Sequence, residues 1–234
     1  MIECKITGVD VSIEKNSSKL LGPVSFELVN SNCTIVLGPN GAGKTSLLRL
    51  LHGLDKPTTG SITWDPLAKI EEQSFVFQSP VILKRNVIEN VYYPLMLKGI
   101  SKKEAITQAE YWLERTSLNH KAYEPAISLS GGEKQRMVIA RSLISDPKLI
   151  FLDEPTVNLD GKSKSQIEKL LKHVINNGTK IIMATHDLGQ AKRLGNDILF
   201  LHHGKLLEVG SATSFFKNPK TKEGLTFLRG EILQ

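Results

Sequence analysis

The feature that most constrains the fold of this chain is a glycine-rich stretch at residues 38–45, which has the form G-x-x-x-x-G-K-[ST]. The apolar run 33–37 precedes it and is typical of a buried strand, and a helical pattern runs from Ser46 until it stops at Gly53. In this context the loop amides and the helix N-terminus can point at one anion. The sequence therefore predicts a phosphate-binding loop within an α/β core.

Two side chains at the end of this stretch carry the chemistry of a nucleotide site. Lys44 is placed to reach the β- and γ-phosphates, and the Thr45 hydroxyl is placed to hold Mg²⁺. The competing interpretation is a glycine turn that joins a strand to a helix by chance. It would require all the fixed residue types and both flanks to agree by accident, so we favour the phosphate loop.

A second glycine-containing stretch, residues 129–132, reads Leu-Ser-Gly-Gly and opens another helical pattern. Its amides and the helix N-terminus would form a second anion site. Taken alone, the stretch is equally well explained as an ordinary helix start, with Ser130 as the N-cap and the glycines in a turn.

An apolar run at residues 149–152 ends in two adjacent carboxylates, Asp153 and Glu154. Ligands bind at the carboxyl ends of strands in open α/β sheets, which is where these acids are predicted to stand. Asp153 is placed to complete the Mg²⁺ shell, whereas Glu154 points elsewhere and can polarise an attacking water. The alternative is a strand-end turn with two solvated acids.

These motifs together resemble the ATP-binding subunit of an ABC transporter. The stretches above are accompanied, in that family's order, by a glutamine at Gln78, by Leu159-Asp160 and by a histidine at His186. The resemblance covers nearly the whole chain, from about residue 2 to about residue 215. It implies an α/β fold in which a P-loop NTPase core with a mostly parallel sheet carries an N-terminal antiparallel β subdomain and a helical insertion subdomain.

The resemblance also implies a division of the chain, which would be a single ABC ATPase domain over residues 1–234. Residues 1–78 and 148–234 would form the core with the β subdomain. Residues 79–147 would form the helical subdomain, which carries the signature loop.

The resemblance implies that the chain binds ATP and Mg²⁺. Lys44 and the loop amides would bind phosphates, Glu154 would be the general base, and His186 would contact the γ-phosphate and support the attacking water. Thr45, Gln78 and Asp153 would surround the Mg²⁺ and the lytic water. The residues of the phosphate loop would be Gly38, Pro39, Asn40, Gly41, Ala42, Gly43, Lys44, Thr45 and Ser46.

A second copy of the chain is implied as a partner, in a head-to-tail dimer with ATP between the two copies. Ser130, Gly131 and Gly132 of one copy would complete the γ-phosphate site of the other, and Asp160 would link the two sites. ATP would then hold the copies together, and its hydrolysis would release them.

The chain departs from the family pattern in four places: near Ile13, at Glu133, at Thr45-Ser46 and at Val157-Asn158. Many relatives place an aromatic side chain against adenine where this chain has Ile13, and no Tyr, Phe or Trp occurs before Phe26. An aliphatic contact is the expected replacement. Glu133 stands where glutamine is common.

Several local patterns predict structure outside the motifs. Ser101 and Glu104 form a predicted capping box, residues 16–18 a turn, and Gly204 the turn of a hairpin. The remaining histidines, including His202, are expected to be solvated.

Composition restricts the function classes further. The net charge is +6, but the charges are scattered apart from residues 217–222 and form no basic patch with aromatic residues, so no nucleic acid is expected. The longest apolar stretches fall far short of the roughly 20 residues of a membrane helix. The N-terminus also lacks the build of a signal peptide. A cytoplasmic location, peripheral on the inner face of the cell membrane, is expected.

Two classes of function compete. In the first, the chain is the motor subunit of a membrane transporter, with integral membrane permease subunits as partners and, indirectly, a substrate-binding protein. In the second, it is a soluble ABC ATPase acting on nucleic acid or ribosomes. A single cassette with a compact insert favours the transporter. Residues 84–97, including Asn90, resemble importer cassettes at the surface that docks membrane subunits, although an exporter cassette is an alternative. Residues 215–219 and 227–231 resemble cassettes of oxyanion importers, particularly those for tungstate.

Overall fold

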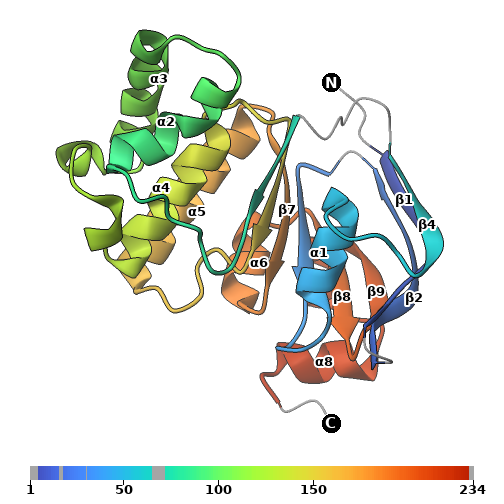
Figure 1. The fold of residues 1–234 in the computed structure, drawn as a ribbon. Helices are drawn as coiled ribbons and strands as arrows, with labels where there is room; N and C mark the ends of the chain where they lie inside the picture. The colour runs from blue at the N-terminus through green and yellow to red at the C-terminus, as the bar shows by residue number, and fades with distance from the viewer. Residues whose placement is uncertain (1–4, 16–17, 30, 65–71, 232–234) are drawn as a thin grey trace. The chain divides into compact units, whose positions relative to one another are not determined.

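The computed structural model describes residues 5–15, 18–29, 31–64 and 72–231. The predicted turn at residues 16–18 lies largely outside these ranges. The chain divides into two compact units, residues 1–73 with 180–234, and residues 74–179. Figure 1 labels most of the elements of both.

The first unit contains an antiparallel sheet with the strand order β2-β1-β4. Its strands are β1 (Lys5–Lys15), β2 (Ser18–Val29) and β4 (Thr59–Trp64). Apolar side chains at alternate positions of β2, among them Val24, Phe26 and Leu28, are buried, as the period of two in a half-buried strand requires. The predicted N-terminal antiparallel β subdomain is confirmed.

The first unit also contains strands in the order β7-β3-β8-β9. β3 pairs in parallel with both β7 and β8, and β9 returns antiparallel to β8. These strands are β3 (Cys33–Leu37), β7 (Lys180–Thr185), β8 (Asp197–His202) and β9 (Lys205–Ser211). Every residue of β3 is buried, as expected for an apolar strand inside a parallel sheet. The predicted strand 33–37 and the hairpin across Gly204 are confirmed.

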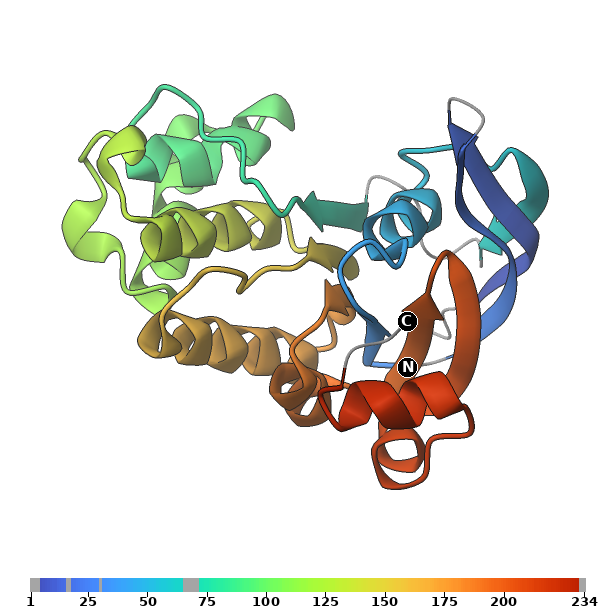
Figure 2. The same ribbon diagram turned by 90° about the horizontal axis from the view of Figure 1, so that it is seen from below.

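Helices accompany these strands in the first unit. They are α1 (Lys44–His52), α6 (Leu188–Leu194), α7 (Ala212–Lys217) and α8 (Lys222–Leu228). α7 and α8 pack on β8 through aromatic contacts, because the Phe200 ring centroid lies 5.4 Å from that of Phe215 and 5.3 Å from that of Phe227. Figure 2 shows these two helices, in red, against the hairpin of β8 and β9.

The second unit is mainly helical. Its strands β5 (Gln73–Val76) and β6 (Leu149–Asp153) are neighbours in one sheet. Its helices are α2 (Val87–Leu97), α3 (Lys102–Arg115), α4 (Gly131–Leu143) and α5 (Gly161–Asn176), with the 3-10 turns η2 (Asn119–Lys121) and η3 (Ala126–Ser128). α4 is its central helix, since it contacts α2, α3 and α5. The fold is therefore mixed α/β, as predicted.

The predicted helical subdomain spans residues 79–147, so the prediction assigns β6 and α5 to the core. In the structure, β6 and α5 belong to the second unit. The two units are compact parts of this chain, whereas the predicted boundaries are those of the family's subdomains. The predicted division into core and helical subdomain therefore stays a prediction. The predicted cap of α3 is present, because the Ser101 hydroxyl accepts a hydrogen bond from the Glu104 amide at 3.3 Å.

The expectation that His202 is solvated is wrong. His202 ends β8 and is only 8% exposed, because it lies two residues after Phe200, on the strand face that α7 and α8 cover. Burial lowers the pKa of its imidazole, and neighbouring His203 lowers it further. Its burial depends on the helices that follow later in the chain.

Candidate nucleotide-binding site

The phosphate loop between β3 and α1 is shaped by glycines at positions where a side chain would collide with the backbone or strain it. A Cβ atom on Gly38 would collide with the carbonyl oxygen of Leu201 in β8. Gly43 has φ 97° and Gly41 has φ 78°, a left-handed conformation that side chains disfavour. The Ala42 amide donates to the Pro39 carbonyl at 3.2 Å and closes the curl of the loop.

The N-terminus of α1 follows Gly43, which has no side chain with which to cap the helix. No side chain caps it, and its first turn holds no acidic residue. Helices α3 to α8 each begin with a side chain that accepts a hydrogen bond from a first-turn amide. Since amides at a helix start need acceptors, the start of α1 fits an anionic ligand.

Lys44 places a positive charge within this loop. Its ammonium donates hydrogen bonds to the carbonyl oxygens of Gly38 at 2.9 Å and Pro39 at 3.0 Å. The side chain is only 6% exposed although it carries a charge. These bonds draw the lysine back over the loop, so its charge is held beside the loop amides.

His186 emerges from the same edge of the first unit's sheet as the loop. β3 and β7 are parallel neighbours in which Leu37 is paired with Thr185, and the next residues are Gly38 and His186. The Thr185 hydroxyl is buried and accepts a hydrogen bond from the Asp187 amide at 3.1 Å. The turn after β7 is thereby ordered, and His186 is exposed at this edge.

The paired acids lie at the end of β6 in the second unit. Asp153 and Glu154 are both buried, at 3% and 7% exposure, so the alternative of solvated acids in a turn is wrong. Glu154 has φ 49°, a left-handed conformation that is uncommon for a residue with a Cβ atom. Such backbone strain gathers at functional sites, where surrounding structure holds it in place.

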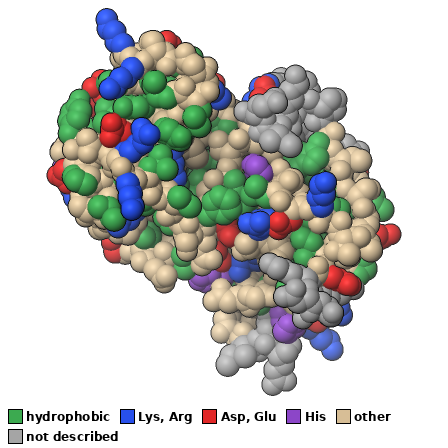
Figure 3. Space-filling view, in the orientation of Figure 1, with side chains coloured by type: hydrophobic (Ala, Val, Ile, Leu, Met, Phe, Trp, Pro, Cys, Tyr) green, Lys and Arg blue, Asp and Glu red, His purple; other side chains and the backbone are tan. Residues whose placement is uncertain are grey.

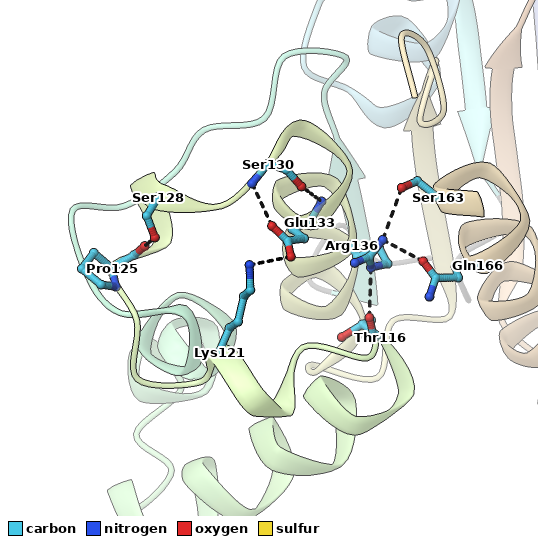
Figure 4. A network of polar contacts seen from close by, with 9 residues as sticks. All are labelled: Thr116, Lys121, Pro125, Ser128, Ser130, Glu133, Arg136, Ser163 and Gln166. Carbon is cyan, nitrogen blue, oxygen red and sulfur yellow. Dashed lines mark hydrogen bonds and ion pairs between the residues drawn. The ribbon is translucent and has the colours of Figure 1, made fainter. Parts of the chain in front are cut away.

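The signature stretch begins α4, and Ser130 is its N-cap. The Ser130 hydroxyl accepts from the Glu133 amide at 3.4 Å, while the Glu133 carboxylate accepts from the Ser130 amide at 2.9 Å (Figure 4). Lys121 is paired with Glu133 at 2.7 Å. The hydrogen bond from Lys121, together with the Ser130 amide, lowers the pKa of Glu133 to about 2. The carboxylate of Glu133 is therefore a fixed negative charge at this helix start.

Asp160 and Gly132 are joined through one serine of α5. Asp160 caps α5 by accepting from the Ser163 amide at 2.8 Å and from its hydroxyl at 3.1 Å. These bonds lower the pKa of Asp160. A Cβ atom on Gly132 would stand 2.5 Å from the Ser163 hydroxyl oxygen. The signature loop and the segment around Asp160 therefore contact each other within the second unit.

Gln78 is exposed just after β5, and the segment that follows it is anchored. The buried Asn90 side chain accepts from the Leu83 amide at 3.0 Å and donates to the Leu83 carbonyl at 3.2 Å. Arg141 of α4 donates to the Asn90 side chain at 3.2 Å and to the Val81 carbonyl at 2.7 Å. Residues 81–86 are thus tied to the helix that begins at the signature.

Sequence reasoning missed two arginines of α4 that organise this unit, Arg136 and Arg141. Each follows the signature at a helical spacing that turns it inward. The available signal was an arginine among apolar residues of an otherwise buried helix face, which on its own suggests a structural role.

The predicted Mg²⁺ donors are a hydroxyl, a carboxamide and a carboxylate, from Thr45, Gln78 and Asp153. These are the hard oxygen donors that Mg²⁺ prefers, and Mg²⁺ commonly takes its other ligands from phosphate and water. No group of three or more His, Cys, Asp or Glu residues able to hold a metal ion occurs in the described ranges. The donor chemistry fits a nucleotide-bound Mg²⁺ better than an all-protein metal site.

A glycine loop at an uncapped helix start, after a buried parallel strand, defines a P-loop nucleotide-binding protein. The family profile described as ABC transporter matches residues 21–157. The arginine transport ATP-binding protein ArtM of Bacillus subtilis (strain 168) is 32% identical over 93% of this chain and 98% of its own length. The phosphate import ATP-binding protein PstB 1 of Streptococcus agalactiae serotype III (strain NEM316) is 34% identical over 95% of this chain and 96% of its own length.

Solved structures of ABC transporter cassettes have the same fold as this chain. cbiO1 from Clostridium perfringens, part of the ABC transporter complex cbiONQ, superposes with a TM-score of 0.80 and 27% identity over 91% of this chain and 90% of its own. A dimeric ATP-binding cassette in a post-hydrolysis state, bound to ADP and Pi, superposes with a TM-score of 0.78. It is 30% identical, and the match covers 88% of this chain and 98% of that one. The chain belongs to the ABC transporter family, in which it is an ATP-binding subunit with ATPase activity.

Proposed function

We propose that this chain hydrolyses ATP with Mg²⁺ as the cytoplasmic motor subunit of an ABC importer. The observation that carries the proposal is the start of α1, where left-handed glycines and an uncapped helix N-terminus surround the Lys44 ammonium. Phosphoryl transfer depends mainly on positioning and on neutralising charge, which this loop supplies. The profile match and the full-length relatives support the same function.

The proposed chemical roles follow from the side chains. Lys44 and the loop amides hold the phosphates in place. Glu154 orients the attacking water and accepts its proton, and His186 supports that water through the γ-phosphate. Mg²⁺, held by Thr45, Gln78 and Asp153, supplies charge neutralisation on the phosphates when it is bound.

We propose further that two copies act together as a head-to-tail dimer. Residues 130–132 would meet the γ-phosphate bound by the other copy, and Asp160 would connect the two sites. The dimeric state of a solved cassette of 30% identity supports this arrangement. Gly132 contacts Ser163, whose amide donates a hydrogen bond to Asp160. This contact supports a link between the signature residues 130–132 and Asp160.

The surface for permease subunits is proposed to lie on the second unit. Apolar side chains are unusually exposed there, including Val81 at 64% and Leu97 at 71%. Figure 3 shows hydrophobic side chains interspersed with lysine and arginine on the visible face of this helical part. Val81 belongs to the anchored segment after Gln78, so force on this surface would reach α4 through Arg141.

The transported substrate is proposed to be a small oxyanion, as the tungstate-type ending of the chain suggests. A relative named for phosphate import is consistent with an oxyanion, whereas the relative named for arginine transport favours an amino acid as the second candidate. A substrate-binding protein encoded beside this chain would decide between them. Calorimetry of that protein with tungstate, molybdate, phosphate and arginine should show one preferred ligand.

The experiment that tests the function is reconstitution with the neighbouring membrane subunits in proteoliposomes. We expect ATP-dependent uptake of substrate, lost in Glu154→Gln, and ATP hydrolysis that rises when membrane subunits are added. Stimulation by RNA or ribosomes, with none by membrane subunits, would instead establish the soluble ABC ATPase. Substrate release from preloaded vesicles without uptake would identify an exporter. Among the described residues, no helix has the length and apolar character needed to span a membrane.

A further inference from the structure

The second unit contains a basic cavity that the proposed ATP site does not use. Its volume is about 450 Å³, and it lies where the end of α3 meets α4 and α5. Cationic or titratable side chains dominate its lining: Arg115, Arg136, Lys169 and His173. No aspartate or glutamate among the described residues lines it.

Arg136 is the central residue of this cavity, because it is buried and only neutral groups bind it. It is 8% exposed. Its Nε donates to the Thr116 carbonyl at 3.0 Å, and its Nη1 donates to the Gln166 side chain at 2.8 Å and to the Ser163 hydroxyl at 3.5 Å (Figure 4). Within the part of the chain that the structure describes, no carboxylate pairs with its guanidinium.

Two acidic side chains near Arg136 are already bonded elsewhere, and one of them, Asp160, is bonded to the Ser163 amide and hydroxyl. Glu133 lies one turn earlier on α4, but it is bonded to Lys121 and to the Ser130 amide. A buried charge without a counter-charge is costly, and proteins normally pair it. The remaining donor capacity of the Arg136 guanidinium, together with Lys169 and Arg115 at the cavity edge, matches the oxygens of a tetrahedral anion.

We propose that this cavity binds a small tetrahedral oxyanion of the phosphate or sulfate class. The anion supplies the counter-charge of Arg136, while Lys169 and Arg115 approach it from the exposed side. Because Ser163 joins Arg136 to Asp160, the anion stabilises the helices that carry the signature and Asp160. This site goes beyond the proposed ATPase function and does not depend on it.

The test is calorimetric titration of the full chain with sodium phosphate, against sodium chloride at equal, low ionic strength. Lys44→Ala is used as the background, so that phosphate at the loop before α1 contributes little. Lys169→Gln removes a charge from the cavity. Lys172→Gln is the matched control, because Lys172 is also exposed on α5 but does not line the cavity. Arg136→Gln, checked for folding by circular dichroism, removes the central donor.

We expect phosphate to bind with a Kd of about 1 mM or lower. Lys169→Gln should weaken binding by about threefold or more through the lost charge, and Arg136→Gln should abolish it. Lys172→Gln should leave the affinity unchanged. No binding beyond that of chloride, or equal weakening by Lys169→Gln and Lys172→Gln, would overturn the proposal.

A lipid headgroup presents the same phosphate chemistry, so vesicles with phosphatidic acid form a second arm of the experiment. Capture by these vesicles without binding of free phosphate would also overturn the proposal of a free anion. Because no arm measures ATP turnover, failure here leaves the ATPase proposal intact. Failure of the ATPase proposal would in turn leave this site untouched.

Discussion

The hydroxyl oxygen of Ser163 lies 2.5 Å from the position that a Cβ atom on Gly132 would occupy. Ser163 cannot easily move aside, because it is buried and its hydroxyl is hydrogen-bonded to Asp160 at 3.1 Å. The second glycine of the signature is thus required by the helix packed against it. Gly131, beside it, has open space at its Cβ position.

Gly132→Ala is therefore expected to destabilise the chain, by about 1–3 kcal/mol, as overpacking in a tight contact does. Gly131→Ala is the matched control and should be neutral or slightly stabilising, because alanine favours a helix. Urea unfolding measures both. Adding Ser163→Ala should relieve part of the loss in Gly132→Ala, and strict additivity of the two changes would contradict this contact.

Glu154→Gln should keep ATP binding and lower turnover by about 10²-fold or more, because the amide cannot accept the proton of the attacking water. The variant should also accumulate as an ATP-bound dimer in gel filtration. Steady-state hydrolysis and fluorescent-nucleotide binding measure the two effects separately. Turnover at the wild-type rate would remove Glu154 from the role of general base.

Lys44→Ala should abolish nucleotide binding or turnover, because it removes the positive charge held beside the loop amides. The chain should still unfold cooperatively, since the Lys44 ammonium bonds the loop carbonyls of Gly38 and Pro39 and serves the ligand rather than the core. Lys56→Ala, at an exposed position, is the control. Unchanged affinity for ATP with persistent turnover would show that the loop was assigned wrongly.

GTP should be hydrolysed within about tenfold of ATP, a difference of about 1.4 kcal/mol, because no Tyr, Phe or Trp occurs before Phe26 to stack on the base. Ile13 is buried and pairs with Leu21 of β2. Beside it, Leu20 is a partly exposed aliphatic side chain whose carbonyl lies next to Gly43. Competition of both nucleotides for hydrolysis gives the ratio, and a preference of several hundred-fold for ATP would show that another residue reads adenine.

The contribution of Glu133 to stability should depend on pH. Its pKa falls from the ordinary 4.5 to about 2 in the folded chain, so its stabilisation is fully present above pH 4.5 and is lost as the pH falls towards 2. Glu133→Gln should thus cost more stability at about pH 6 than at about pH 3. Urea unfolding of both proteins at each pH measures this, and an equal cost at both would contradict the Lys121 pairing.

The sequence by itself determined the local elements and the motifs. The strand at 33–37, the helix that stops at Gly53 and the cap at Ser101 follow from periodicity and from residues a few positions apart, so they could be read directly. The glycine loop could be recognised from its own residues, although Gly38 is also required by the Leu201 carbonyl, which lies far along the chain.

Only the tertiary structure decided which polar residues are buried and what they touch. His202 is covered by helices that come later in the chain, and Arg136 is enclosed by residues 20 to 30 positions away. The reason that Gly132 must be glycine lies in Ser163, on another helix. Such contacts join residues far apart in sequence, and neither periodicity nor propensity carries information about them, so burial, charge pairing and steric fit emerge only when the chain is folded.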